Sequence, residues 1–332
     1  MNGEQPPRVV LRGRTVAVVW TSKAANGTKL MQSRSEDGGR TFAKATAVPG
    51  GDAAGNRGWE NIAVDRHGRV YAVWLDHREL AQQDGAVAAS HHDHASMSTK
   101  PDGVAMAQRS KLYVSSLDGA VAPRAVTGGV CYCCKTALAT SADGAVFAAW
   151  RHVYPGNIRD IAFTSSRDGG RTFTPPLRVS EDQWVLEGCP DDGPAMAVDA
   201  KNRIHIVWPT LVTEKAAGAE PTIALFYATS ADGRRFTPRK RLPTEGMPHH
   251  PQIAIGQDGS LTMTWDEGAN GKRRAAMLRT TVDAAAAEAL ARTPLGDGAV
   301  YPVVAVSGDA AVVAWTSGGS SSSTIQVVRI GG

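Results

Sequence analysis

Residues 70–74 read Val-Tyr-Ala-Val-Trp, an apolar run that ends in tryptophan. Equivalent runs end at five more tryptophans, Trp20, Trp150, Trp208, Trp265 and Trp315. Successive tryptophans are separated by 54, 76, 58, 57 and 50 residues. A recurrence of this size indicates a repeat architecture, in which equivalent loops of different repeats gather in one place.

Each repeat has the same internal order. A short apolar segment comes first, then a polar turn, then the run that ends in tryptophan, and finally a third apolar segment such as residues 161–164 or 225–228. The turns carry Asp-Gly or Asn, which accept the positive φ of tight hairpins; they span residues 65–68, 141–144, 199–202 and 257–259. Evenly spaced short strands without helices between them predict an all-β repeat fold. Six units of three to four strands predict a six-bladed β-propeller. Only residues 283–292 look helical.

The composition fits a globular β protein. The chain has 332 residues, of which 42% are hydrophobic and 20% charged, and its 35 glycines suit many turns. The net charge of +4 is not gathered in a block, which argues against nucleic acid as a partner. No apolar run is long enough to span a membrane. We therefore expect one monomeric propeller domain over residues 1–332, with an insertion at about residues 76–110.

A second signature lies in the turn after the third segment. Residues 35–42 read Ser-Glu-Asp-Gly-Gly-Arg-Thr-Phe, and residues 166–173 read Ser-Arg-Asp-Gly-Gly-Arg-Thr-Phe. Shortened relatives begin at Ser230 and Ser116. With this Asp box, or BNR repeat, the chain resembles the sialidase superfamily of β-propellers over all six repeats. The box residues are expected to be structural: Asp and Ser bond the turn backbone, Gly supplies unusual dihedrals, and the aromatic residue anchors the turn.

The propeller topology predicts where a site lies. The segments that lead into the first strand of each blade should open on one face, and binding sites occupy such mouths. Two neighbouring segments contain all four cysteines of the chain, and the next contains a histidine pair; these residues are Cys131, Cys133, Cys134, Cys189, His249 and His250. Thiolates and imidazoles together suit soft metals, so we predict a site for copper, with zinc as the alternative.

Weaker candidate ligands accompany this set. The insertion contains a histidine- and methionine-rich stretch, and two further candidates lie in other loops; these residues are His91, His92, His94, Met97, His152 and Met247. A solvated flexible loop is the plainer interpretation of the three clustered histidines, and a loop methionine more often packs than ligates.

The cysteines leave three interpretations open. They form a metal or redox-active site, or they are inert thiols, or Cys189 pairs with Cys131, Cys133 or Cys134 in a disulfide. Two disulfides would require a bond within residues 131–134, which is geometrically awkward. That difficulty favours metal or redox chemistry.

The resemblance to sialidases implies a different site. Those enzymes use three arginines, an Asp acid/base and a Tyr–Glu nucleophile pair. The positions that match are Arg8 and Tyr301, with Glu60 and Asp76 as further candidates. Other segments carry Cys, Asp, Pro and His in place of arginine, and a single arginine cannot form the carboxylate clamp of three. The second hypothesis is therefore a sialidase-like glycoside hydrolase or a glycan-binding module that also uses Trp59, and the third is a scaffold for a protein partner. Asp-box propellers are often exported, so we expect a periplasmic or secreted protein.

Overall fold

The computed structural model describes residues 5–81, 102–186, 190–212, 220–287, 289–307, 310–319 and 322–331. Over these residues the chain forms six antiparallel sheets, five of four strands and one of three. In every sheet, strands that follow one another in the sequence pair with one another. The six predicted blades are therefore confirmed, and each tryptophan run forms the second strand of its sheet.

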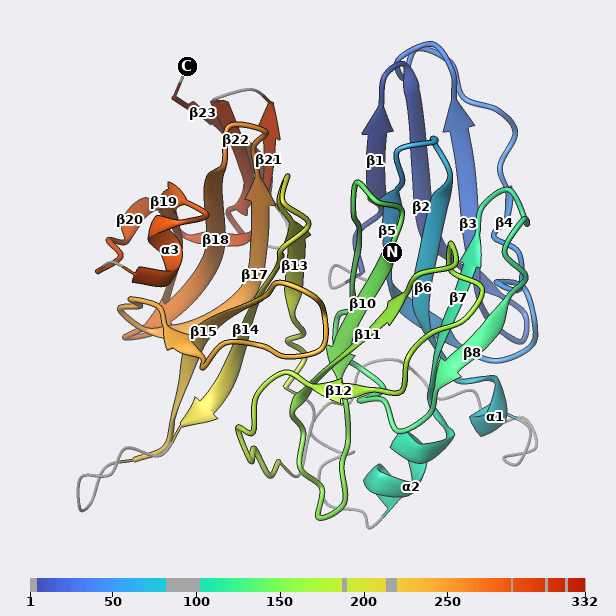
Figure 1. Ribbon diagram of the computed structural model, residues 1–332, viewed down its shortest axis with the longest axis horizontal. Coiled ribbons are helices and arrows are strands. Elements are labelled where there is room, and N and C mark those ends of the chain that lie inside the picture. The colour runs from blue at the N-terminus through green and yellow to red at the C-terminus, as the bar shows by residue number, and fades with distance from the viewer. Residues whose placement is uncertain are drawn as a thin grey trace. The chain divides into compact units, whose positions relative to one another are not determined.

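The first of two compact units contains three sheets and is drawn from blue to green in Figure 1. Its first strands β1, β5 and β9 are neighbours, β5 lying next to both others. The strands are β1 (Arg8–Arg12), β2 (Thr15–Ala24), β3 (Gly27–Ser35) and β4 (Thr46–Ala47); β5 (Arg57–Val64), β6 (Val70–Asp76), β7 (Lys111–Ser116) and β8 (Arg124–Thr127); β9 (Ala137–Thr140), β10 (Val146–Arg151), β11 (Ile161–Ser166) and β12 (Leu177–Arg178).

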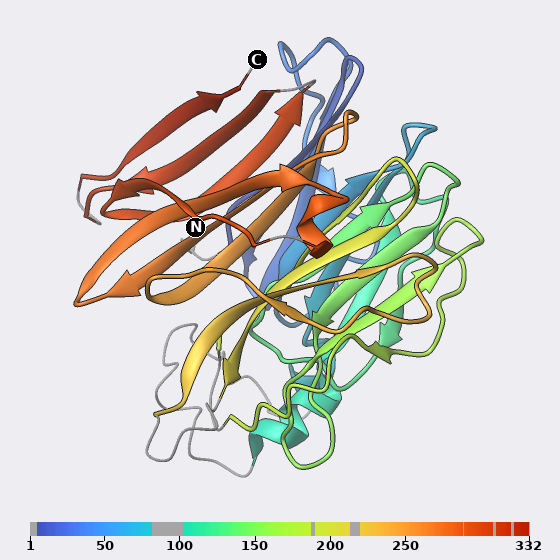
Figure 2. The ribbon, with the colours of Figure 1, turned by 60° about the vertical axis from the view of Figure 1, so that its left-hand side comes forward.

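The second unit contains the other three sheets. The three strands of its last sheet, drawn in red, run side by side in Figure 2. The strands are β13 (Ala195–Val198), β14 (Ile204–Val212), β15 (Thr222–Ser230) and β16 (Lys240–Arg241); β17 (Met247–Ile255), β18 (Ser260–Ala269), β19 (Lys272–Thr281) and β20 (Thr293–Asp297); β21 (Ala299–Ser307), β22 (Ala310–Ser317) and β23 (Thr324–Ile330). Whether residues 1–332 act as one domain stays a prediction.

The tryptophans are the largest side chains of the core. Trp74, Trp150, Trp208 and Trp265 are fully buried, whereas Trp20 and Trp315, in the first and last sheets, are partly buried. A buried indole needs an acceptor for its N–H. Three of the four buried tryptophans donate to an acceptor two residues later in the sequence, at Asp76, His152 and Glu267. Asp76 and Glu267 lie on the same strand as their tryptophan, and His152 directly follows β10. Residues at i and i+2 lie on the same face of a strand, so the spacing places acceptor and donor together.

The turns are built as the sequence predicts. In the first of them, the backbone N–H groups of His67 and Arg69 donate to Asp65 Oδ1 at 2.8 and 2.9 Å. In the two full Asp boxes, Ser35 and Ser166 bond the aspartate two residues on, and Asp37 and Asp168 accept from the turn backbone. The predicted anchoring by the aromatic residue is wrong for Phe42, whose side chain is 45% exposed rather than buried against the sheet.

Helices differ from the sequence prediction. The stretch at 283–292 forms only α3 (Ala284–Ala287), and β20 begins at Thr293. Two helices lie in the predicted insertion, α1 (Arg78–Ala81) and α2 (Asp102–Arg109). Within the described residues, no helix is long and apolar enough to cross a membrane.

Candidate functional site

Three of the four cysteines lie on one short loop between β8 and β9. The loop is pinned to the end of β10: Cys131 N–H donates to Arg151 O at 2.9 Å, and Val153 N–H donates to Gly129 O at 2.8 Å. Gly129 has φ +72°, and a Cβ there would meet the His152 ring at 2.8 Å. The loop can approach β10 this closely only because residue 129 is glycine.

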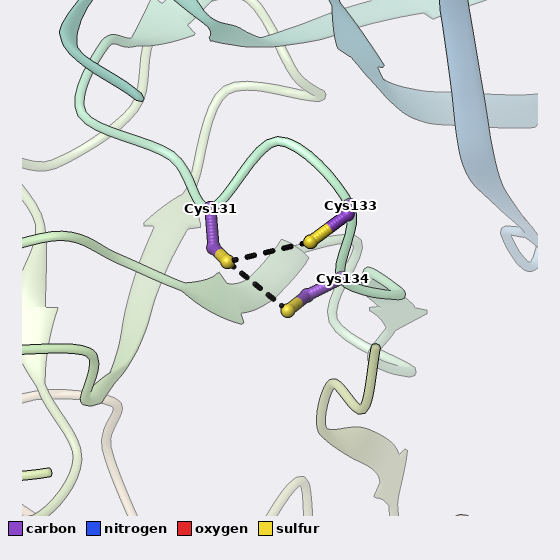
Figure 3. A group of neighbouring side chains, drawn as sticks. All are labelled: Cys131, Cys133 and Cys134. Carbon is purple, nitrogen blue, oxygen red and sulfur yellow. Dashed lines mark hydrogen bonds between the residues drawn. The ribbon is translucent and has the colours of Figure 1, made fainter. Parts of the chain in front are cut away.

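The three sulfur atoms form a compact group, which we call the cysteine group (Figure 3). Cys131 Sγ lies 3.2 Å from Cys134 Sγ and 3.9 Å from Cys133 Sγ. All three sulfurs lie within 4.8 Å of one another, and the side chains are buried, at 1–4% exposure. The structure thus brings together three members of the predicted set, which also included Cys189, His249 and His250.

The three sulfurs are not in the same chemical state. Cys131 and Cys134 are free thiols, whereas Cys133 is disulfide-bonded. A disulfide sulfur is not a thiolate ligand, so in this form the cysteine group offers two thiols rather than three. The fourth predicted member of the set, Cys189, lies outside the described residues.

Two arginines give the cysteine group a positive environment. Arg159 Nη1 donates to Cys131 Sγ at 3.3 Å, and Arg151 Nη1 donates to Arg159 O at 2.8 Å. Both guanidinium groups are buried. The S–H hydrogen bond from Cys134, helped by these arginines, lowers the pKa of Cys131 to about 6. Burial raises the pKa of Cys134, and the neighbouring Cys131 raises it further. The pKa of Cys131 is therefore the lower of the two, and Cys134 is the donor of the hydrogen bond between them.

His152, a weaker predicted ligand, is not part of the cysteine group. The ring of His152 accepts from Trp150 and lies edge-on to Tyr154 at 4.5 Å. Burial lowers the pKa of His152 to about 4, so the imidazole is neutral. The remaining candidates of the insertion, His91, His92, His94 and Met97, lie outside the described residues.

The histidine pair belongs to the second unit, on β17. His249 Nδ1 lies 2.6 Å from Asp192 Oδ2, and His250 Nδ1 lies 2.6 Å from Asp266 Oδ1. Metal-bound histidines commonly hold a carboxylate in this way, which leaves Nε2 to face a ligand. The nearby Met247 is 49% exposed at the start of the strand.

Asp266 connects His250 to two further residues of the second unit. It pairs with Arg273 and accepts the N–H of Tyr301 at 3.3 Å. The rings of His250 and Tyr301 lie 4.2 Å apart, at 34° to each other. The predicted sialidase-like tyrosine therefore packs against an imidazole that an aspartate orients.

Backbone strain marks the segments that lead into the first strands. Trp59, His250 and Tyr301 have φ between +51° and +54°, and each lies in a β-bulge of β5, β17 or β21. A bulky residue in this region costs on the order of 1–3 kcal/mol and is concentrated at functional sites. These segments are recognisable in the sequence, but the bulges are not, because the positive φ falls on non-glycine residues.

The remaining sialidase-like candidates are Arg8, Glu60 and Asp76, and among the described residues only the Asp76 carboxylate of this set is held in ion pairs. Arg8 Nε donates to the main-chain oxygen of Glu60 at 3.1 Å, and the Glu60 carboxylate has no hydrogen-bond partner in the described part of the chain. Burial raises the pKa of Glu60 to about 7. Asp76, in contrast, pairs with Arg57 and Arg78. Its carboxylate is thus committed to an ion-pair network.

Comparisons with known proteins give structural likeness without sequence likeness. No protein-family model and no curated protein matches the sequence. A protein of unknown function from Dyadobacter fermentans DSM 18053 superposes with a TM-score of 0.60 at 13% identity, over 98% of this chain and 93% of that one. The alpha-L-arabinanase of Penicillium chrysogenum gives a TM-score of 0.61 at 11% identity, with coverages of 98% and 93%.

A third similar structure is the Hadza microbial sialidase Hz136, with a TM-score of 0.56 at 12% identity. The match covers 98% of this chain but only 65% of that sialidase. At identities this low the likeness supports a shared fold and nothing more, and the six antiparallel sheets agree with that fold. The chain has the fold of the sialidase-like six-bladed β-propellers.

Proposed function

We propose that this chain binds a soft metal ion, copper(I) in the first place and zinc as the alternative, through Cys131, Cys133 and Cys134. The observation that carries the proposal is the convergence of three buried sulfurs within 4.8 Å on one short loop. Thiolates are the ligands that select copper(I) and zinc.

The sulfur distances support this proposal. Two thiolates bound to one tetrahedral ion at about 2.3 Å lie about 3.8 Å apart. Cys131 and Cys133 are 3.9 Å apart, and Cys131 and Cys134 are 3.2 Å apart. Binding would therefore require shifts of less than about 1 Å in a loop that already holds the sulfurs together.

The redox state of Cys133 sets a condition. Its disulfide must be reduced before a third thiolate is present, so binding should depend on a reductant. A disulfide is typical of exported proteins, which supports the expectation of a periplasmic or secreted location.

Copper(I) titration of the reduced chain, under anaerobic conditions and against a chromophoric chelator, tests the proposal. We expect about one ion per chain, and a loss of at least tenfold in affinity for Cys131→Ser or Cys134→Ser, since each removes a thiolate ligand. Met277→Leu is the control, because it removes a buried sulfur of the second unit. Stoichiometric binding that survives both serine variants would refute the proposal.

The histidine pair needs a separate test, because His249 and His250 are held by aspartates of the second unit. The double variant His249→Ala/His250→Ala should lower the metal stoichiometry if the imidazoles ligate an ion. Unchanged stoichiometry would restrict the metal to the cysteine group.

A second candidate function is carbohydrate hydrolysis or binding, and the carboxyl group of Glu60 is the observation that favours it. A carboxyl with a pKa of about 7 can act as a general acid or base at neutral pH, and Arg8 lies beside it. Hydrolysis of a fluorogenic sialoside, lost in Glu60→Gln and Tyr301→Phe, would support this function. If the chain turns over neither sialosides nor arabinans and binds no glycan, this second function is refuted and only the metal proposal stands.

A further inference from the structure

The spacing between two of the cysteines carries a further inference. Cys131 and Cys134 are three residues apart, and Cys134 N–H lies 3.4 Å from Cys131 O, so the loop turns back on itself between them. The turn brings the two free sulfurs to 3.2 Å. A disulfide bond requires about 2.05 Å between sulfurs, so a movement of little more than 1 Å would join them.

The contacts around the pair give its two sulfurs different roles. The sulfur of Cys131 accepts hydrogen bonds from Arg159 Nη1 and from the S–H of Cys134. The sulfur of Cys134 is the donor of that second bond. A sulfur that accepts from a guanidinium is the better nucleophile, and a neighbouring thiol can resolve what the nucleophile forms.

Burial limits what can reach the pair. Both side chains are 1% exposed, and the apolar cluster around them includes Trp150, Val153 and Tyr132. A protein disulfide or a bulky thiol reagent is too large for such a position. Hydrogen peroxide is small enough to reach a buried sulfur through ordinary fluctuations of a loop.

We propose that Cys131 and Cys134 form a dithiol pair that small hydroperoxides oxidise to a disulfide. The Cys131 sulfur attacks one peroxide oxygen, the O–O bond breaks, and the leaving hydroxide takes up the proton that the Cys131 thiol has released, which gives water. The Cys131 sulfenic acid then reacts with the Cys134 sulfur. The S–O bond breaks, the S–S bond forms, and a second water leaves with the thiol proton. In sum, one dithiol and one hydrogen peroxide give one disulfide and two waters, so sulfur is oxidised and oxygen is reduced.

The test uses the full metal-free chain with its Cys133 disulfide intact. Treatment with hydrogen peroxide should lower the intact mass by about two hydrogen masses, and peptide mapping should find Cys131 joined to Cys134. In Cys134→Ser the reaction should stop at the sulfenic acid of Cys131, which dimedone traps when the chain is unfolded in its presence. A bulky aromatic disulfide reagent should react with the folded chain far more slowly than peroxide does.

Variants of Arg159 test the role of the positive charge. Arg159→Gln should slow oxidation roughly tenfold, because the Cys131 sulfur loses the guanidinium group that donates to it. Arg159→Lys should restore part of the rate, since it keeps the charge. Arg167→Gln is the matched control, because Arg167 pairs with Asp143 in solvent. An unchanged mass in the wild-type chain, or a cross-link at another position, would overturn the proposal whatever the variants do.

This proposal goes beyond the metal site and can fail independently of it. Oxidation is measured in the absence of metal, and copper titration is measured anaerobically in the presence of a reductant. If the chain binds copper but both thiols remain free after treatment with hydrogen peroxide, the dithiol proposal is refuted and the metal proposal stands.

Discussion

Glu60→Gln is the substitution whose effect can be worked out most fully. Glu60 is 1% exposed, and neither carboxylate oxygen has a hydrogen-bond partner among the described residues. Loss of hydration is the main reason that its pKa is raised from 4.5 to about 7, while Arg8 opposes the rise only in part. Glutamine keeps the shape of the side chain and removes its titration.

The sign of the effect follows from the two pKa values. Between pH 4.5 and about 7 the folded chain holds a proton on Glu60 that the unfolded chain has released. The stability from this carboxyl is fully present below its unfolded pKa and is lost as the pH rises through the folded pKa. The separation of the two values corresponds to on the order of 3 kcal/mol, lost by about pH 8.

Urea unfolding from about pH 4 to about pH 8 measures this loss. The wild-type chain should lose on the order of 3 kcal/mol more than Glu60→Gln across that range. Glu220→Gln is the control and should follow the wild type, because Glu220 is exposed. Parallel curves for the wild type and Glu60→Gln would refute the reasoning, since they would mean that Glu60 titrates alike in the folded and unfolded chains.

Three more outcomes follow from burial. Asp76→Ala should cost about 3–5 kcal/mol in urea unfolding, because it leaves the fully buried Arg57 without its carboxylate. Arg167→Ala breaks an exposed pair with Asp143 and should cost less than about 1 kcal/mol, and equal losses would contradict this account. Trp150→Ala should cost about 3–5 kcal/mol by the same assay, and Trp20→Ala clearly less, because only Trp150 is fully buried; a larger loss at Trp20 would contradict it. Mass spectrometry after alkylation should find two thiols that become labelled only on unfolding, and fast labelling of the folded chain would show that they are not buried.

Most of the fold could be predicted because its signals are local. The apolar runs, the Asp-Gly turns and the recurring tryptophans each report on a few neighbouring residues, and the six sheets follow them closely. The acceptor two residues after Trp74, Trp150 and Trp265 was also readable, since side chains alternate along a strand.

The features that could not be predicted depend on contacts distant in the sequence. The bulges at Trp59, His250 and Tyr301 place non-glycine residues at positive φ, which local propensity disfavours and surrounding structure must impose. Likewise, no sequence pattern shows that Asp76 is held by Arg57 and Arg78 rather than exposed to a substrate.

The cysteine group was found from the sequence, but its chemical state was not. The sequence alone allowed a metal site, a disulfide or free thiols, and the structure contains two of these, a disulfide at Cys133 and free thiols at Cys131 and Cys134. The expectation that a bond within residues 131–134 is awkward does not hold for Cys131 and Cys134, because the chain turns between them and brings their sulfurs to 3.2 Å, as Cys-x-x-Cys spacing allows.

The state of Cys133 decides which chemistry the loop can perform. With Cys133 in a disulfide, the cysteine group offers only the two thiols of Cys131 and Cys134, which lie 3.2 Å apart, so this form keeps the dithiol pair but has one thiolate ligand fewer for an ion. Reduction of Cys133 adds a third thiolate at 3.9 Å from Cys131, near the distance that metal binding requires. Metal occupancy should therefore follow the reduction of Cys133, and protein prepared with that disulfide intact should bind copper(I) more weakly than fully reduced protein.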